Sequence, residues 1–185
     1  AVLIGANLRD AIMGRVSLSG ADLTGSDLSR ANLSIANLNR ATLNRANLEE
    51  AGLSGADMRA AQLKGAILRG AILRGAILGD ADLSRADLSK ANLRWANLSN
   101  ANLTGADLTE VDLTDAEISP QVLAKARSVS KVERADSTPY DVVPSAVATR
   151  EGPLPSAQAP TYQRPGDKPS TPPPARPEGK SRPLP

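Results

Sequence analysis

Hydrophobic and polar residues along positions 1–120 follow a strict period of five. This stretch divides into 24 units without an insertion, from AVLIG and ANLRD to VDLTD and AEISP. The first position is Ala in 21 units and the third is Leu in 21 units, whereas the second is most often Asp or Asn. The fourth and fifth positions are mostly polar, charged or glycine. Such self-similarity indicates a repeat architecture.

A period of five fits neither regular secondary structure. Five residues of α-helix advance about 500°, so the leucines would scatter around the whole circumference. In a straight strand, an odd period would send successive leucines to opposite faces. The pattern instead predicts a coil that bends once in each unit, so that the first and third positions point inward each time. Gly at the fifth position and Asp or Asn at the second suit repeated turning.

The units ADLTG, ANLSI, ADLSR, ANLRW and ADLTE resemble the pentapeptide repeat family, whose pattern is A-(D/N)-L-x-x. The resemblance implies an all-β solenoid, namely a right-handed quadrilateral β-helix with four units per coil and about six coils. It implies that leucines stack along the axis, and the predicted structural core includes five residues at one side: Leu23, Leu43, Leu63, Leu83 and Leu103.

The chain changes character near residue 120. Only one of the 14 prolines lies before residue 121, and residues 121–185 carry 10 basic and 6 acidic side chains. We expect the β-helix to span 1–118, a capping helix to span 119–127, and a disordered Pro-rich basic tail to span 128–185. Ser119 and Pro120 are favourable residues for the start of that helix. A homodimer through this coil end is the competing interpretation.

The two ends of the chain carry further expectations. Pro174–Pro177 matches a PxxP motif for an SH3-like groove, although a tail that binds nothing is the simpler interpretation. The first residue is already in register and is not Met, so we expect a fragment or a processed product. No signal peptide or membrane-spanning segment is visible, and we expect a cytoplasmic location.

Composition limits the available chemistry. The chain has no Cys, no His and no Phe, and its aromatic residues are Trp95, Tyr140 and Tyr162. A Ser-His-Asp triad, a Cys nucleophile and a zinc finger are therefore excluded. Carboxylates such as Asp82 and Asp87 recur because the repeat recurs. We expect no catalytic residue, no cofactor and no metal site.

Two departures from the repeat nominate a partner surface. The second position, normally polar, is isoleucine in three successive units: Ile67, Ile72 and Ile77. The fourth position is basic in four successive units, which predicts a basic girdle: Arg59, Lys64, Arg69 and Arg74. Five more basic residues lie within about one coil: Arg40, Arg45, Arg85, Lys90 and Arg94. The simpler interpretations are apolar residues spread round a perimeter and an ordinary solvated charged face.

These features favour a non-catalytic scaffold that presents a rigid surface to a protein partner, which the sequence does not identify. The alternative is a DNA-mimic that binds DNA gyrase or topoisomerase IV, a role to which the resemblance points. Residues 1–120 carry 12 basic and 14 acidic side chains, a net charge of 12 − 14 = −2. This small charge and the basic middle weaken the mimic hypothesis. Without a groove-reading element, we expect no specific nucleic-acid binding.

Overall fold

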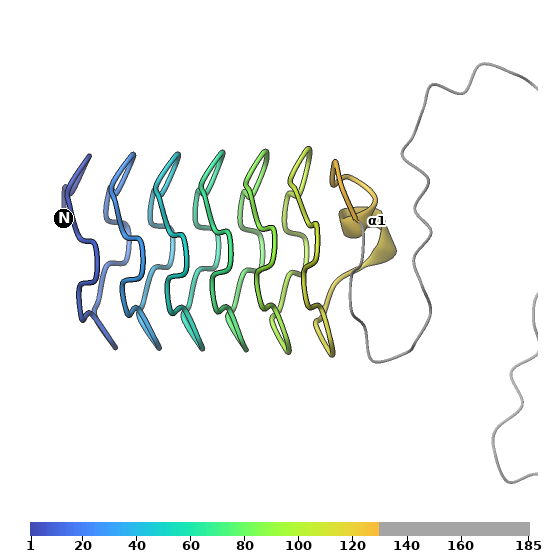
Figure 1. Ribbon diagram of the computed structural model, residues 1–185, viewed down its shortest axis with the longest axis horizontal. Helices are drawn as coiled ribbons and strands as arrows, with labels where there is room; N and C mark the ends of the chain where they lie inside the picture. The colour runs from blue at the N-terminus through green and yellow to red at the C-terminus, as the bar shows by residue number, and fades with distance from the viewer. Residues whose placement is uncertain (130–185) are drawn as a thin grey trace, which may run out of the picture. The chain divides into compact units, whose positions relative to one another are not determined.

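The computed structural model describes residues 1–129, which form a stack of coils followed by one short helix (Figure 1). From residue 130 onward, the predicted Pro-rich tail and its PxxP motif lie outside the described residues. The helix is α1, residues Pro120–Leu123. Within residues 1–129, β-structure occurs as isolated bridges at one residue of each five-residue unit, rather than as longer strands. No helix in this part of the chain is long and apolar enough to cross a membrane.

Each coil consists of four units. The second position of a unit pairs in parallel with the second position of the fourth unit after it, as in Val2–Asp22, Asp22–Thr42 and Thr42–Gln62. The ladder thus has four sides, which we name by their units in the first coil. Side A begins with residues 1–5, side B with 6–10, side C with 11–15 and side D with 16–20, and each side recurs once in every coil.

Backbone hydrogen bonds join the coils at three points in each unit. On side A, the Leu23 N–H donates to the Thr42 carbonyl at 2.7 Å, and the Thr42 N–H donates back to the Ala21 carbonyl at 2.8 Å. The Gly25 N–H adds a third bond to the Asn44 carbonyl at 2.9 Å. The coils therefore satisfy one another's backbone groups along the axis, as a stacked coil requires.

A tight turn follows each bridge. The N–H of the next unit donates to the carbonyl of the third position, as from Ala46 to Leu43 at 3.0 Å. The fifth position has a positive φ in all 23 units from Gly5 to Asp115, the geometry of a type II turn. Only eight of these residues are glycine, and even the β-branched Ile35 adopts φ 59°. Coil-to-coil pairing thus holds residues in a conformation that they rarely adopt alone.

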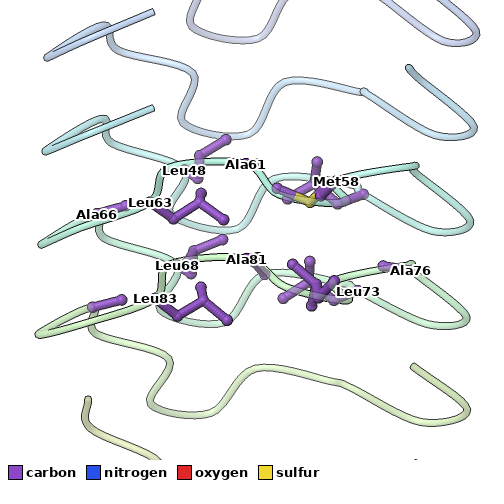
Figure 2. Packing of buried hydrophobic residues seen from close by; sticks show 14 of the residues in the cluster. Leu48, Met58, Ala61, Leu63, Ala66, Leu68, Leu73, Ala76, Ala81 and Leu83 are labelled. Carbon is purple, nitrogen blue, oxygen red and sulfur yellow. The ribbon is translucent and has the colours of Figure 1, made fainter. Parts of the chain in front are cut away.

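The interior is filled by the first and third positions. Figure 2 shows leucines of neighbouring coils stacked along the axis, as Leu63 on Leu83 and Leu48 on Leu68, with alanines beside them in the same coils. Leu23, Leu43, Leu63, Leu83 and Leu103 are each fully buried. Every buried side-chain polar atom within residues 1–129 has a hydrogen-bond partner. The core is thus mostly alanine and leucine and contains no aromatic ring within residues 1–129, and the buried Ser26 hydroxyl donates to the Leu23 carbonyl at 2.8 Å.

At the C-terminal end, α1 covers the last coil with the buried Val122 and Leu123. Ser119 is its N-cap, and its hydroxyl accepts from the Val122 N–H at 3.3 Å. The helix ends at Leu123, before the predicted end at 127. The reason is that the chain returns to the ladder, where the Arg127 N–H donates to the Ala106 carbonyl at 2.8 Å. Ser128 then pairs with Asp107.

Candidate interaction surfaces

The second-position carboxylates hold the turns together. The Asp22 carboxylate accepts from the Thr24 hydroxyl at 2.6 Å and from the Thr24 N–H at 3.0 Å. These bonds, the hydroxyl first, hold the pKa of Asp22 below its ordinary value. Asp82 and Asp87 make the same bond to the N–H two positions further along the chain. Each such acid has a local structural role, and no group of acids in residues 1–129 is arranged to hold a metal ion.

The isoleucine triple is exposed but is divided among three sides. The exposed fractions are 42% for Ile67, 46% for Ile72 and 38% for Ile77. The bridges place Ile67 on side B, Ile72 on side C and Ile77 on side D. Because the three side chains point away from different sides, one flat partner cannot contact all of them.

Most of the basic girdle is compensated within the rod. The Arg59 guanidinium donates to the Asp57 carboxylate at 2.9 and 2.6 Å. Arg69 forms an ion pair with Glu49 of the preceding coil, and Arg74 lies over the Trp95 ring, 4.8 Å from its centroid. Among residues 1–129, only the Lys64 ammonium of this girdle makes no hydrogen bond, ion pair or ring contact. The girdle therefore presents less free charge than its four cations indicate.

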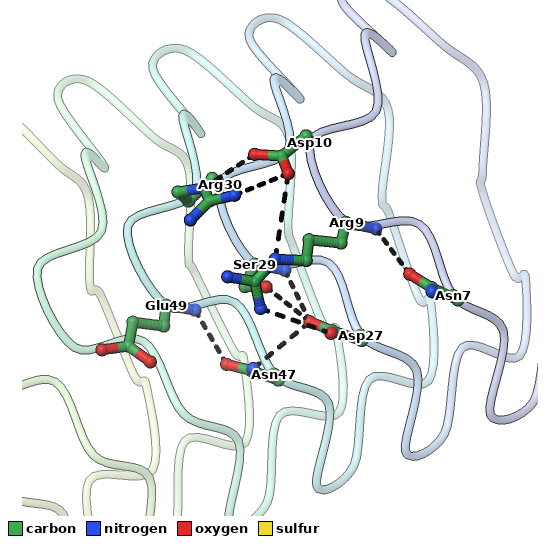
Figure 3. A network of polar contacts seen from close by, with 8 residues as sticks. All are labelled: Asn7, Arg9, Asp10, Asp27, Ser29, Arg30, Asn47 and Glu49. Atoms are coloured by element: carbon green, nitrogen blue, oxygen red, sulfur yellow. Dashed lines mark hydrogen bonds and ion pairs between the residues drawn. The ribbon is translucent and has the colours of Figure 1, made fainter.

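Side B carries a dense network of such compensating contacts. Figure 3 shows Arg30 bound to Asp10 of the preceding coil, with donor–acceptor distances of 2.7 and 2.6 Å. In the same network, Asp27 accepts from the Ser29 hydroxyl at 2.7 Å and from the Asn47 amide at 3.2 Å. Most of the charged groups of this side thus form ion pairs or hydrogen bonds with residues of adjacent coils.

Trp95 is a surface residue that sequence reasoning missed. It is 50% exposed, and its indole N–H donates to Asp115 Oδ2 at 3.1 Å. Arg74 and Arg94 lie over its ring, at 4.8 and 5.1 Å from the centroid. The available signal was the four-unit length of a coil, which places Trp95 directly between positions 75 and 115 on side C.

Side C contains the longest uncharged stretch of the ladder. Units 31–35 and 51–55 contain no charged residue, and no other side has two successive units of this kind. Side C also holds four of the eight large exposed apolar residues in residues 1–129: Ile12, Ile35, Ile72 and Trp95. Glycines occupy the corner between Ile35 and Trp95, at Gly55 and Gly75. This side therefore combines exposed apolar side chains with a corner at which two successive coils carry no side chain.

A surface groove of about 400 Å³ lies near the C-terminal end of the ladder. Its lining includes Arg85, Asp87, Gly105 and Asp107. Arg127 also lines it and donates to Asp107 at 2.8 Å. Two arginines and two aspartates balance one another there, so the groove has no net preference for either sign of charge.

The family model for pentapeptide repeats matches residues 1–34, 36–75 and 76–115, with eight copies. Several solved structures are similar. HetL from the cyanobacterium Nostoc sp. strain PCC 7120, involved in heterocyst differentiation regulation, is 31% identical, with 71% of each chain covered and a TM-score of 0.33. Rfr23 from the cyanobacterium Cyanothece 51142 is 41% identical over 54% of this chain and 62% of that chain, with a TM-score of 0.39.

A third similar structure is a pentapeptide repeat protein of the Arabidopsis thaliana thylakoid lumen. It is 30% identical over 64% of this chain and 81% of that chain, with a TM-score of 0.42. No curated protein sequence matches the chain. The family model covers more than half of the chain, and the predicted resemblance is confirmed. The chain belongs to the pentapeptide repeat family, whose fold is the right-handed quadrilateral β-helix.

Proposed function

We propose that this protein is a non-catalytic scaffold whose side C binds a protein partner. The observation that carries the proposal is the gathering of exposed apolar side chains on side C, at Ile12, Ile35, Ile72 and Trp95. The interior offers no competing site, because its first and third positions are packed with buried alanine and leucine.

The chemistry of side C supports protein binding. Protein interfaces are enriched in aromatic residues and arginine and depleted in Lys, Asp and Glu. Trp95 with Arg74 and Arg94 matches the first part of that composition, and tryptophan and arginine are frequent binding hot spots. The hydrogen-bonded ladder holds these groups in place before a partner arrives, which lowers the entropic cost of association.

Ile72 is the member of the predicted isoleucine triple that belongs to this surface. Ile67 and Ile77 occupy the same position of the repeat on sides B and D. They therefore serve as matched controls. Ile72→Asp should weaken partner binding roughly tenfold or more, because it places a charge within an apolar interface, while Ile77→Asp should leave binding within about twofold.

Photo-crosslinking in the native host tests the surface directly. A photoreactive amino acid replaces Asn32 on side C or Asn37 on side D, both exposed second-position asparagines. We expect a discrete protein adduct from position 32 that is lost in the Ile72→Asp background, and none from position 37. Equal adducts from both positions, or none from either, would contradict the proposal.

The gyrase alternative has its own test. The net charges of the four sides are +1 for A, −3 for B, +1 for C and −1 for D, which sum to the array total of −2. No side thus presents the strongly acidic surface that imitation of DNA requires. Inhibition of gyrase supercoiling by the purified protein at micromolar concentration would nevertheless favour the DNA-mimic role. A homodimer through a coil end predicts a doubled mass in light scattering.

A further inference from the structure

Four basic residues gather on and beside side A without an internal partner. Arg45, Lys64 and Arg85 belong to side A, and Arg40 occupies the corner where side D leads into it. All four are exposed. Within residues 1–129, none of their cationic groups makes an ion pair or a hydrogen bond. This set, the basic surface of side A, contrasts with the compensated Arg59 and Arg69.

Around Arg45 and Lys64 the neighbouring residues of side A are neutral, whereas Arg85 shares its unit with Asp82 and lines the groove with Asp87 and Asp107. Units 41–45 and 61–65 contain no carboxylate, and their second and fourth positions hold Thr42, Asn44 and Gln62 beside Lys64. The Asn44 amide donates to the Gln62 side-chain oxygen at 3.3 Å, and the Lys64 N–H donates to Asn44 Oδ1 at 3.0 Å. The amides are therefore occupied with each other and leave the cations facing solvent.

The side chains of Arg45 and Arg85, at the corner between sides A and B, each lie against a glycine of the next coil. Arg45 Cγ lies 3.9 Å from where a β-carbon would stand at Gly65, and Arg85 Cγ lies 3.7 Å from the corresponding point at Gly105. Each arginine stem thus lies against the glycine of the next coil, so both guanidinium groups sit on one corner, two coils apart. At about 4.8 Å per coil, this separation is roughly 10 Å.

We propose that the basic surface of side A binds an acidic, extended segment of a partner protein. In an extended chain, side chains on one face recur about every 7 Å, and the long, flexible side chains of Arg45 and Arg85 can adjust their separation of roughly 10 Å to reach two successive carboxylates. Arginine pairs with carboxylates through two parallel hydrogen bonds, which adds geometric selectivity to the charge. This surface lies on a different side from side C, so either proposal can fail without the other.

Nucleic acid fits the same surface less well. Duplex binding draws its affinity from many phosphate contacts, about 6–10 in a typical case, whereas the basic surface of side A has four cations. Units 41–45, 61–65 and 81–85 contain no aromatic residue that could stack on an exposed base. A long polyanion would also pass the corner onto side B, which carries seven acidic and four basic residues. A short acidic peptide avoids that repulsion.

The test measures binding of two labelled synthetic peptides to the full chain by fluorescence anisotropy. One peptide alternates Glu and Ser, and the other alternates Gln and Ser. The double variant Arg45→Gln/Arg85→Gln removes two cations from side A. The matched control Arg15→Gln/Lys90→Gln removes two cations from sides C and B, where they also occupy fifth positions of positive φ. The basic residues beyond 129 are present in every protein compared.

We expect the Glu peptide to bind more tightly than the Gln peptide. Its affinity should fall as the salt concentration rises to roughly 0.15 M. The side A variant should lose about tenfold in affinity, and the control less than about twofold. Equal losses in both variants, or no binding of the Glu peptide to the wild-type chain, would overturn the proposal. A duplex or single-stranded oligonucleotide that competes more strongly than the Glu peptide would overturn it in favour of nucleic acid.

Discussion

Trp95 donates its indole N–H to the Asp115 carboxylate at 3.1 Å, across one coil of the rod. The two residues are four units apart, which is the length of one coil. Arg30 and Asp10 stand in the same relationship on side B, at 2.6 Å. The exterior is therefore organised in columns of residues that recur once per coil, and neighbours within a column neutralise several of its charges.

Fluorescence can report the environment of Trp95, because it is the only tryptophan in the chain. Arg74 lies 4.8 Å from the ring centroid and should concentrate anions beside it. We expect Arg74→Gln to lower the iodide quenching constant about twofold at low salt, with the difference shrinking as salt rises. Arg59→Gln on side D is the control and should leave quenching unchanged. An identical quenching constant in both variants would contradict the stacked geometry.

Truncation of the core should be costly. Leu63 is fully buried between Leu43 and Leu83 of the adjacent coils, so Leu63→Ala should lower the free energy of unfolding by about 2–5 kcal/mol. Lys64→Ala, at the next position but exposed, should change it by less than about 0.5 kcal/mol. Circular dichroism during denaturant unfolding measures both. Leu63→Asp should unfold the array locally or entirely, and unchanged melting of that variant would refute the register.

Two glycines of one coil should respond to alanine in opposite directions. Gly75 has φ +62°, so Gly75→Ala should destabilise the protein by about 1–2 kcal/mol. Gly79 has no such conformation, and a β-carbon there would lie 3.8 Å from the Ser99 carbonyl oxygen, an ordinary contact. Gly79→Ala should therefore stabilise by about 0.4–1 kcal/mol, because it restricts the unfolded chain. Melting temperatures that shift in the same direction would contradict this turn geometry.

Acid should weaken the fold through the second-position aspartates. Bonds from Thr24 to Asp22, from Ser29 to Asp27 and from Thr109 to Asp107 lower the pKa of each acid from 3.8. The unfolded chain then binds more protons than the folded chain just below that value. The stabilisation is complete above pH 3.8 and is lost as pH falls through the lowered pKa values.

Asparagine offers a matched test of this effect, because Asn102 Oδ1 already accepts from the Thr104 hydroxyl at 2.7 Å. The triple variant with Asp22→Asn, Asp27→Asn and Asp107→Asn should retain the turns yet lose less stability in acid. Melting temperature measured from neutral pH down to about pH 2 gives the comparison. If the melting temperature of the variant falls as steeply with pH as that of the wild-type chain, then other groups control the loss of stability in acid.

Several structural features were predictable because each depends only on residues within one unit. Small Ala and large Leu two positions apart, followed by a turn, indicate which side chains are buried. The left-handed conformation of Ile35 and Trp95 was not predictable, because neither residue favours it and pairing with adjacent coils imposes it. The early end of α1 at Leu123 likewise reflects the return of Arg127 and Ser128 to the ladder.

The candidate surfaces divide in the same way. The sequence alone was enough to identify the family, the inward positions and the isoleucines and cations that depart from the repeat. It did not show that Arg59 and Arg69 are paired whereas Arg45, Lys64 and Arg85 are free within residues 1–129. Nor did it show that Trp95 stands among the apolar residues of side C. The local repeat decides which way a side chain points, and it already brings Asp57 to Arg59 within one unit. Glu49 and Asp115, the partners of Arg69 and Trp95, belong to adjacent coils, and only stacking brings them together.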